Sequence, residues 1–397
     1  MAAGLVLAAG AYAVAVVLLL RTTVPSGLDL PKVDVDATFG AAAVDRARDY
    51  ERIARLFFVL GEVLVLVVLG LYARYGARLT RESAAGRIGT GMLLGMLGLG
   101  ILWIAQVPFG LLDLWWQRRH GISRVGYLEW MVNSWLGLGG VFLFTCLAIL
   151  IVMALAGPLR DRWWIAGGPA FVLLAALFTF ALPYLTPNLH RPSPAIVAEA
   201  QELSKIQGTD PVRVDVQDVH QETTSPNAEA VGIGPTERVI LWDTLLDGRF
   251  PPGDVRVVLG HEIGHIVRGH IWKGIIWYAL FALPGAFLIA HFTRRRGGMY
   301  EPRAVPLSLF VLVVLQLLAL PLQNLVTRRQ EGEADWQALQ ATRDPQAAKD
   351  LFKRFTSTAL ADPSPPTWDY LLVESHPTGA QRVAMAEAWA ARQQGGP

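Results

Sequence analysis

Cysteine and charge are what this sequence has least of. Its 397 residues include a single cysteine, Cys146, which lies inside an apolar run. One cysteine excludes both a disulfide framework within the chain and a thiolate metal site, and Cys146 is expected to be a small buried apolar residue. Charged residues make up 17% of the chain, whereas a soluble domain carries about 25%. This deficit predicts a membrane protein.

The sequence is instead rich in long apolar runs. Hydrophobic residues make up 53% of the chain, and the net charge of +2 provides no basic excess that would indicate nucleic-acid binding. Glu62, inside one of the runs, is expected to face protein or a wet cavity, in either a structural or a functional role. Seven runs are long enough to cross a bilayer: residues 3–20, 56–72, 90–112, 135–157, 163–185, 272–292 and 304–326.

The first run requires a choice between a membrane span and a cleaved signal peptide. A signal peptide begins with basic residues and has a shorter apolar core, but no Lys or Arg precedes Arg21. We therefore interpret residues 3–20 as a retained span. Both sides of the membrane would carry many arginines, so the positive-inside rule does not decide the orientation. The uncharged N-terminus favours an N-terminus outside and a C-terminus inside.

The spans and the polar stretches divide the chain into four regions. Residues 1–185 hold five spans, and residues 271–327 form a two-span hairpin. Residues 186–270 form a polar region with a small predicted sheet, and residues 328–397 a second polar region of helices. The expected fold is mostly α: a polytopic membrane protein whose polar regions form a small α+β domain of the zincin type.

Turn and periodicity signals place elements within the polar regions. Ser193 and Gly208 mark the start and stop of a helix. "VRVDVQDV" and "ERVILWDTLL" are two strand candidates, with "NAEAVGIG" as a third. Asp254 is expected to cap a helix through "VRVVLGHEIGHIVRGH". Further helices are expected from the last span through Ala341, over 346–358 and over 377–393.

The stretch "HEIGH", residues 261–265, carries the strongest chemical signal. His261 and His265 lie one turn apart, about 400° around a helix, so both rings leave from one face and can bind one zinc ion. Glu262 points elsewhere and can take a proton from a water that the metal activates. His270 is about 900° beyond His261, half a turn out of phase if the helix continues. We therefore expect His270 to support a metal ligand or to pack the helix, rather than to bind the metal itself.

A third metal ligand has to come from another segment. Glu331 and Asp335 are again one turn apart on an expected helix, so Glu331 can bind the metal while Asp335 accepts a hydrogen bond from a ligating histidine. Glu333 should face away from both. Each ligand helix would be the extension of a span, with residues 261–292 forming one continuous rod. The metal is therefore expected within about 10 Å of the membrane boundary.

These motifs resemble those of the type I CAAX prenyl protease family, which are integral-membrane zinc metallopeptidases. The resemblance is carried by "HEIGHIVRGH", "TRRQEGEAD" and "SHPTGAQR", and more weakly by "SPNAEAVGIGPTERVILWDTLL" and "RRHGISRVG". It implies one zinc ion held by His261, His265 and Glu331, with Glu262 as general base. The departures within "HGISR" and before Asn227 leave the substrate open.

The resemblance also assigns roles beyond the metal ligands. His376 and Arg382 would approach the site, with His376 steadying the oxyanion, and Asn227 and Ala228 would lie on an edge strand that binds an extended peptide. It further implies seven spans around a chamber, with the site on the cytoplasmic side. The Ala- and Arg-rich, Lys-poor composition suggests a bacterial inner-membrane protein.

The predicted function is hydrolysis of peptide bonds, in peptides or membrane proteins near the bilayer. Such an enzyme could act in membrane-protein quality control. Two alternatives stay open. A polytopic transporter that binds metal would require charged residues at midplane and broken spans in related halves, but the sequence shows no internal symmetry. A catalytically idle scaffold that binds zinc would have no need of the intact Glu262.

Overall fold

The structure is a computed structural model that describes residues 2–79 and 85–394, apart from several side chains in the first helix. Within these residues, six helices are long and apolar enough to cross a membrane. They cover the second to seventh predicted runs: α3 (Ala41–Tyr75), α4 (Gly86–Arg119), α5 (Tyr127–Leu159), α6 (Trp164–Leu185), α9 (His270–Thr293) and α10 (Val305–Thr342). The first predicted run forms α1 (Ala2–Leu19), an apolar helix that is not among these six.

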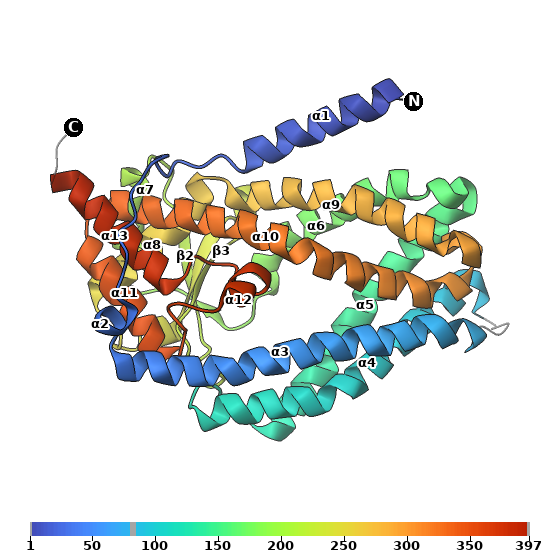
Figure 1. Cartoon of the computed structure of the whole chain (residues 1–397), viewed down its shortest axis with the longest axis horizontal. Helices are drawn as coiled ribbons and strands as arrows, with labels where there is room; N and C mark the ends of the chain where they lie inside the picture. The colour runs from blue at the N-terminus through green and yellow to red at the C-terminus, as the bar shows by residue number, and fades with distance from the viewer. Residues whose placement is uncertain (1, 80–84, 395–397) are drawn as a thin grey trace.

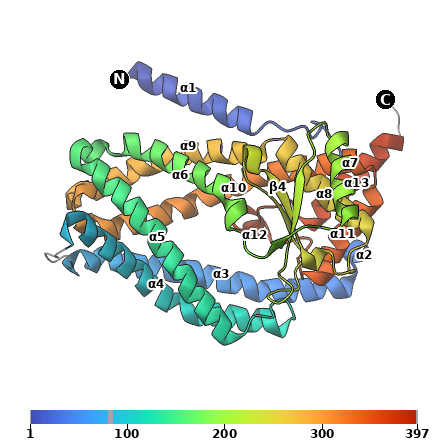
Figure 2. The same ribbon diagram turned by 180° about the vertical axis from the view of Figure 1, so that it is seen from behind.

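The long helices run along the length of the molecule in two groups. α3 and α4 pack together on one side, and α6 and α9 pack together on the other, while α10 contacts both α9 and α3. α5 crosses diagonally between the groups (Figure 2). Large apolar side chains of these helices, such as Leu143, Leu173 and Leu318, remain more than half exposed, as expected for helices that lie in a membrane. Glu62 on α3 is half-buried. The chamber implied by the resemblance stays a prediction.

A small sheet begins the polar domain at one end of the helices (Figure 2). Its strands are β1 (Leu189–His190), β2 (Arg213–Gln217), β3 (Ala228–Val231) and β4 (Arg238–Trp242). The spatial order is β1-β2-β4-β3, with β2 and β4 parallel and the two outer strands antiparallel to their neighbours. All three predicted strands are present. β1 was not predicted, since two residues are too few to show alternation.

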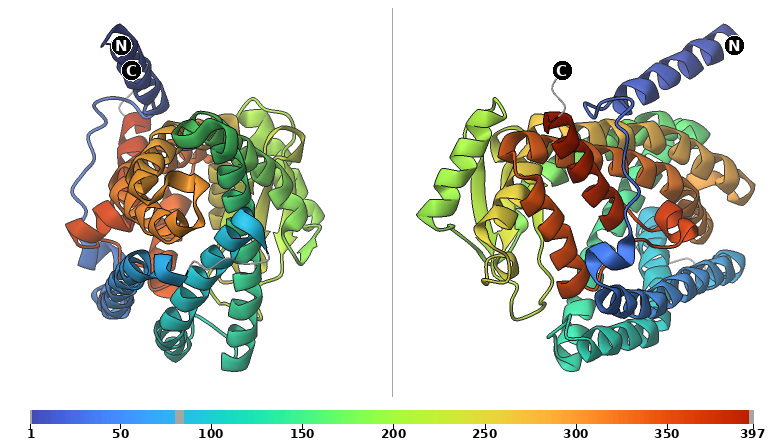
Figure 3. Two further views of the ribbon diagram at one scale, coloured as in Figure 1. Left: turned by 90° about the vertical axis from the view of Figure 1, so that its right-hand side faces the viewer. Right: turned by 60° about the vertical axis from the view of Figure 1, so that its left-hand side comes forward.

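Six shorter helices complete the described part of this domain (Figure 3), of which α7 and α8 pack against the sheet while α11 packs against α8 and α13. They are α2 (Val35–Phe39), α7 (Pro194–Ile206), α8 (Pro252–Val267), α11 (Pro345–Thr358), α12 (Thr367–Leu372) and α13 (Gly379–Gln394). Fully buried side chains from separate elements form the core, including Leu203, Val239, Leu259, Leu351 and Val383. The core also takes residues from α10, because α10 continues beyond the predicted span to Thr342. At 38 residues, this helix is about 57 Å long.

Two local predictions were wrong. Asp254 does not cap the motif helix: α8 begins at Pro252, and the Asp254 carboxylate instead pairs with Arg354 at 2.6 Å. Residues 261–292 do not form one rod either, because α8 ends at Val267 and Gly269 adopts a left-handed conformation with φ of 61° before α9 begins. Glycine accepts this conformation without steric cost, so the chain changes direction between the motif and the span. The predicted four-region division stays a prediction.

Candidate metal centre and active site

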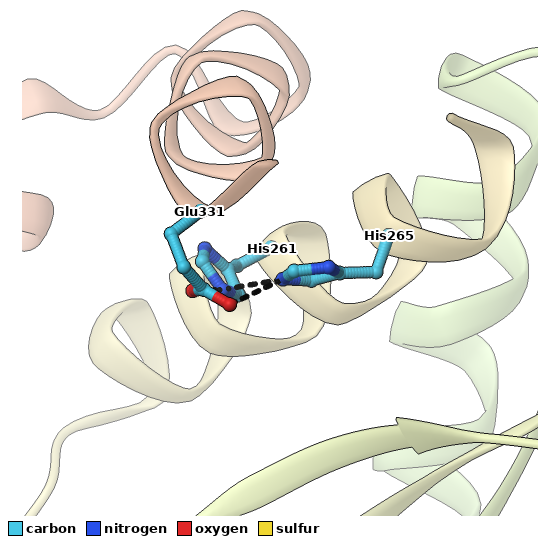
Figure 4. A group of neighbouring side chains, drawn as sticks. All are labelled: His261, His265 and Glu331. Carbon is cyan, nitrogen blue, oxygen red and sulfur yellow. Dashed lines mark hydrogen bonds and ion pairs between the residues drawn. The ribbon is translucent and has the colours of Figure 1, made fainter. Parts of the chain in front are cut away.

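His261 and His265 project from the same face of α8 toward α10 (Figure 4). Their Nε2 atoms lie 3.0 Å apart. His261 is buried and His265 is partly exposed. Two imidazole nitrogens that face each other this closely share one small space, as two ligands of one ion do.

Glu331 enters the same space from α10. One of its carboxylate oxygens, Oε2, lies 3.1 Å from His261 Nε2, and the other, Oε1, lies 3.5 Å from His265 Nε2. Each of the three residues thus offers a ligand atom, and these atoms all lie within 4.8 Å of one another. The structure therefore brings together the three residues that the sequence proposed as metal ligands.

Small residues allow α8 and α10 to approach closely enough for this arrangement. A Cβ atom added at Gly264 would lie 3.1 Å from Gln337 Cβ and 3.5 Å from Ala334 Cα, and one added at Gly260 would lie 3.4 Å from Ala338 Cα. Larger side chains at these glycines would push the helices apart. The separation of the two helices, and with it the reach of Glu331, depends on this glycine face.

His261 is oriented from its far side by Asp335. Its Nδ1 lies 2.9 Å from Asp335 Oδ1, and Arg382 Nε donates to Asp335 Oδ2 at 2.8 Å. The Nδ1–H of His261 thus donates to the carboxylate, which leaves the Nε2 lone pair pointing toward Glu331. Burial lowers the pKa of His261, but hydrogen bonds to Asp335 and Glu331 raise it more, to about 10. The buried carboxylates therefore favour a positive charge at this point, which a proton or a metal ion can supply.

His265 has a parallel support in His270, one of the two roles that the sequence left open for this residue. His270 Nδ1 lies 3.0 Å from His265 Nδ1, and His270 Nε2 lies 3.1 Å from Glu333 Oε2. If His270 donates from Nε2 to Glu333, its Nδ1 accepts from His265 and leaves His265 Nε2 free for a metal. Thr23 and Arg268 also donate to Glu333.

The break at Gly269 explains how His270 reaches His265. On an unbroken helix His270 would lie half a turn out of phase, but a left-handed residue restarts the helical phase. Glu333 does point away from the ligands, as expected, but it is buried rather than solvated, with 1% exposure. The glycine in "RGH" was the only local signal that could have indicated the break.

Glu262 lies on α8 close to the sheet edge. It is buried, and α8 packs against β3. Burial raises the pKa of Glu229 on β3, and the negative charge of Glu262 raises it further, so the two carboxylates are neighbours. Asn227 and Ala228 come directly before Glu229. The backbone carbonyl of Asn227 accepts from Trp242 N on one side, and β4 is the only described strand that pairs with β3, whose other edge is therefore open.

His376 approaches the centre from the loop between α12 and α13. Its Nε2 lies 3.2 Å from Glu331 Oε2, and its side chain is 52% exposed. Ser375 Oγ lies 3.0 Å from its other ring nitrogen. His376 thus stands on the open side of the cluster, whereas His261 and Glu331 are buried on the other side.

The Asp335–Arg382 pair gives a prediction that concerns metal affinity. Replacing Asp335 with Asn removes the charge that orients His261, and outer hydrogen-bond partners of this kind are worth about 10- to 100-fold in metal affinity. We expect a loss of zinc affinity in this range, measured by competition with a chelating dye. The Asp350→Asn protein, altered at a partly exposed carboxylate on α11, serves as control. An unchanged affinity in Asp335→Asn would contradict the orienting role.

Comparisons with known proteins point to the same chemistry. Residues 195–390 match the family described as peptidase family M48. An uncharacterized metalloprotease of Bacillus subtilis, YhfN, is 25% identical over 283 residues, which cover 68% of this chain and 66% of that protein. A protease HtpX homolog of Kineococcus radiotolerans is 28% identical over 197 residues, covering 42% of this chain and 65% of that protein. The chain thus spans slightly less than two thirds of the length of these relatives.

A solved structure extends the likeness to nearly the whole chain. The crystal structure of Ste24p from S. mikatae superposes with a TM-score of 0.74 at 16% identity, covering 95% of this chain and 96% of that one. This confirms the predicted fold class: long membrane helices with a small α+β domain at one end. The predicted resemblance to a family of membrane metallopeptidases is likewise confirmed.

Proposed function

We propose that the chain, whose residues 195–390 match peptidase family M48, is a membrane zinc endopeptidase that hydrolyses peptide bonds close to the bilayer. The observation that carries the proposal is the convergence of His261, His265 and Glu331 on one point. Glu262 and His376 lie beside the same point, and an open strand edge lies next to Glu262.

The donor set fits one zinc ion per chain. Two imidazole nitrogens and one carboxylate oxygen form the ligand set of many catalytic zinc sites, which keep a fourth position for water or substrate. When bound, zinc supplies a Lewis acid that polarises the peptide carbonyl and lowers the pKa of water toward about 7. Asp335 and His270 hold the two imidazoles with their Nε2 lone pairs directed at the site.

The remaining residues divide the proton transfers and the charge stabilisation. Glu262 takes a proton from the attacking water and passes it to the departing amide nitrogen, which is general base and then general acid catalysis. His376 stands on the open side and donates from its ring to the oxygen that becomes negative in the tetrahedral transition state. Arg382 acts through Asp335 and keeps His261 in place.

The substrate is proposed to be an extended peptide segment that adds to β3. Its backbone would pair with the outward-facing N–H and C=O groups of Ala228 on the edge of β3, because the carbonyl of the neighbouring Asn227 is already bonded to Trp242 N on β4. Strand addition of this kind holds a chain without requiring a particular sequence. Since β3 borders α8, a strand added there passes close to Glu262. Segments of membrane proteins that leave the bilayer in an extended form fit this description, and their removal in quality control is the task that we propose.

We place the protein as a multi-pass component of a bacterial inner membrane, with the site on the cytoplasmic side. The six long apolar helices support the membrane location. The polar domain extends from α9 and α10, and these helices keep the metal centre near the membrane surface.

Removal of the metal tests this proposal. Treatment of the purified protein with a strong chelator is expected to abolish cleavage of an internally quenched, unstructured peptide, and about one equivalent of zinc per chain should restore it. The reason is that without the ion nothing polarises the carbonyl or activates the water. Cleavage that persists at the original rate in metal-free protein would contradict the proposed mechanism.

A further inference from the structure

A second group of buried charges lies where α3 meets the segment that follows α11. It shares no residue with the metal centre. Figure 1 shows α12, which carries one of its members, between α10 and α3. The group has four carboxylates from separate parts of the chain: Glu51 on α3, Asp362 in the loop after α11, Asp369 on α12 and Glu374 after α12.

Arg55 is the central cation of this group. Its guanidinium pairs with Glu51 and Asp369, and Nη2 lies 3.1 Å from Asp362 Oδ2. Arg328 lies nearby, but its Nη1 donates to the backbone carbonyls of Tyr370 and Glu374. Among the described residues, the only other cation in contact is Arg48, which reaches Asp362 at 3.9 Å from the exposed side.

The carboxylates are not fully balanced by these cations. Four carboxylates face three guanidinium groups, one of which, Arg48, reaches the cluster only from the exposed side, so negative charge remains in excess. Asp369 is only 1% exposed, yet its Oδ1 has no hydrogen-bond partner. The Glu374 carboxylate makes no ion pair or hydrogen bond within the described residues; burial raises its pKa, and the charge of Asp369 raises it further. Buried carboxylates in proteins are normally paired or bound to metal.

The geometry of the carboxylates suits a bound ion. Glu51, Asp369 and Glu374 each offer one oxygen, and the three oxygens lie within 4.8 Å of one another. Oxygens that each lie about 2.4 Å from a common ion can be at most about 4.8 Å apart, and this is the usual distance for Ca²⁺. A set of oxygen donors without nitrogen or sulfur favours Ca²⁺, Mg²⁺ or Mn²⁺ over zinc.

We propose that Glu51, Asp369 and Glu374 bind one hard divalent cation, separate from the catalytic metal. The ion neutralises the excess negative charge and gives the unpaired oxygen of Asp369 a partner. It also joins α3 to the segment that leads into His376, two residues after Glu374. The cation is thus a structural tie between a membrane helix and the loop that carries a catalytic residue. The proposal does not depend on peptide hydrolysis.

The experiment uses Mn²⁺ as the probe, because its free form gives an electron paramagnetic resonance signal that disappears on binding. Zinc-loaded, full-length protein in detergent micelles is titrated with Mn²⁺, and the zinc content is measured before and after. We expect about one Mn²⁺ per chain, displaced by Ca²⁺ or Mg²⁺, with no loss of zinc. Glu374→Gln is expected to weaken binding at least 10-fold. Glu387→Gln, at an exposed carboxylate on α13, should bind as the parent does.

A thermal shift gives a second readout. Addition of Ca²⁺ or Mn²⁺ should raise the Tm of the parent by several degrees and leave the Tm of Glu374→Gln unchanged. Glu374 is half-buried, and its carboxylate makes no hydrogen bond to any described residue, so the Gln variant should retain its structure. Failure of the parent to bind Mn²⁺ at saturating concentration would overturn the proposal. Equal binding by the parent, Glu374→Gln and Asp369→Asn would overturn it as well.

Discussion

Replacement of Glu262 with Gln is expected to lower peptide hydrolysis by about 10²- to 10⁴-fold, the range typical of a lost general base. Gln has nearly the same shape but cannot take a proton from water. The side chain is not among the residues that converge on the metal position, so the bound zinc should stay at one per chain. The measurements are the cleavage rate of a quenched peptide and the zinc content of the same preparation.

Glu202→Gln is the matched control for this variant. Glu202 is an exposed carboxylate on α7 whose only described ion pair is with Arg256, and its replacement should leave the cleavage rate unchanged. A Glu262→Gln protein that retains its zinc and cleaves at the parent rate would rule out Glu262 as the base. The inactive protein would also retain bound substrates, which mass spectrometry after purification from native membranes could identify.

Glu331→Gln is expected to have the largest effect on metal binding. Its carboxylate lies within 3.5 Å of both imidazole Nε2 atoms, and a neutral amide is a poor zinc ligand. We expect zinc affinity to fall well over 100-fold, which exceeds the effect of an outer hydrogen-bond partner. Peptide hydrolysis should fall in parallel, measured in zinc-buffered solution.

Glu333→Gln is the comparison variant for Glu331→Gln, because Glu333 lies two residues after Glu331 on the same helix. Glu333 contacts His270 rather than the metal position, so its replacement should weaken zinc binding by only about 10- to 100-fold. Circular dichroism would check that both variants fold. If Glu333→Gln lost zinc as completely as Glu331→Gln, the assignment of Glu331 as a direct ligand and Glu333 as an indirect support would be wrong.

Features that depend on a single stretch of sequence were predicted well. Six of the seven apolar runs correspond to helices that could span a membrane, and the other forms α1. Ser193 caps α7, with its hydroxyl accepting from Ile196 N, and Gly208 follows the helix end. The spacing of His261 and His265 sufficed to place both rings on one face, since an α-helix repeats every 3.6 residues.

Predictions that assumed an uninterrupted helix were less successful. His270 appeared to be out of phase only because the break at Gly269 was not recognised. A single glycine in an apolar, helical stretch is tolerated in many helices, so the local sequence did not distinguish a break from a continuous rod. Asp254 similarly fitted the preferences of an N-cap, but the two prolines before Gly253 start the helix earlier.

The sequence by itself determined the membrane class, the motif helix and the identity of the residues that can bind metal, because these follow from composition and helical period. Only the tertiary structure decided which side chains meet. The approach of Glu331 to α8 depends on the glycine face between two helices. The ion pair of Arg55 with Asp369 joins residues 314 positions apart. Contacts of this kind arise from packing between distant segments, and no periodicity or local spacing encodes them.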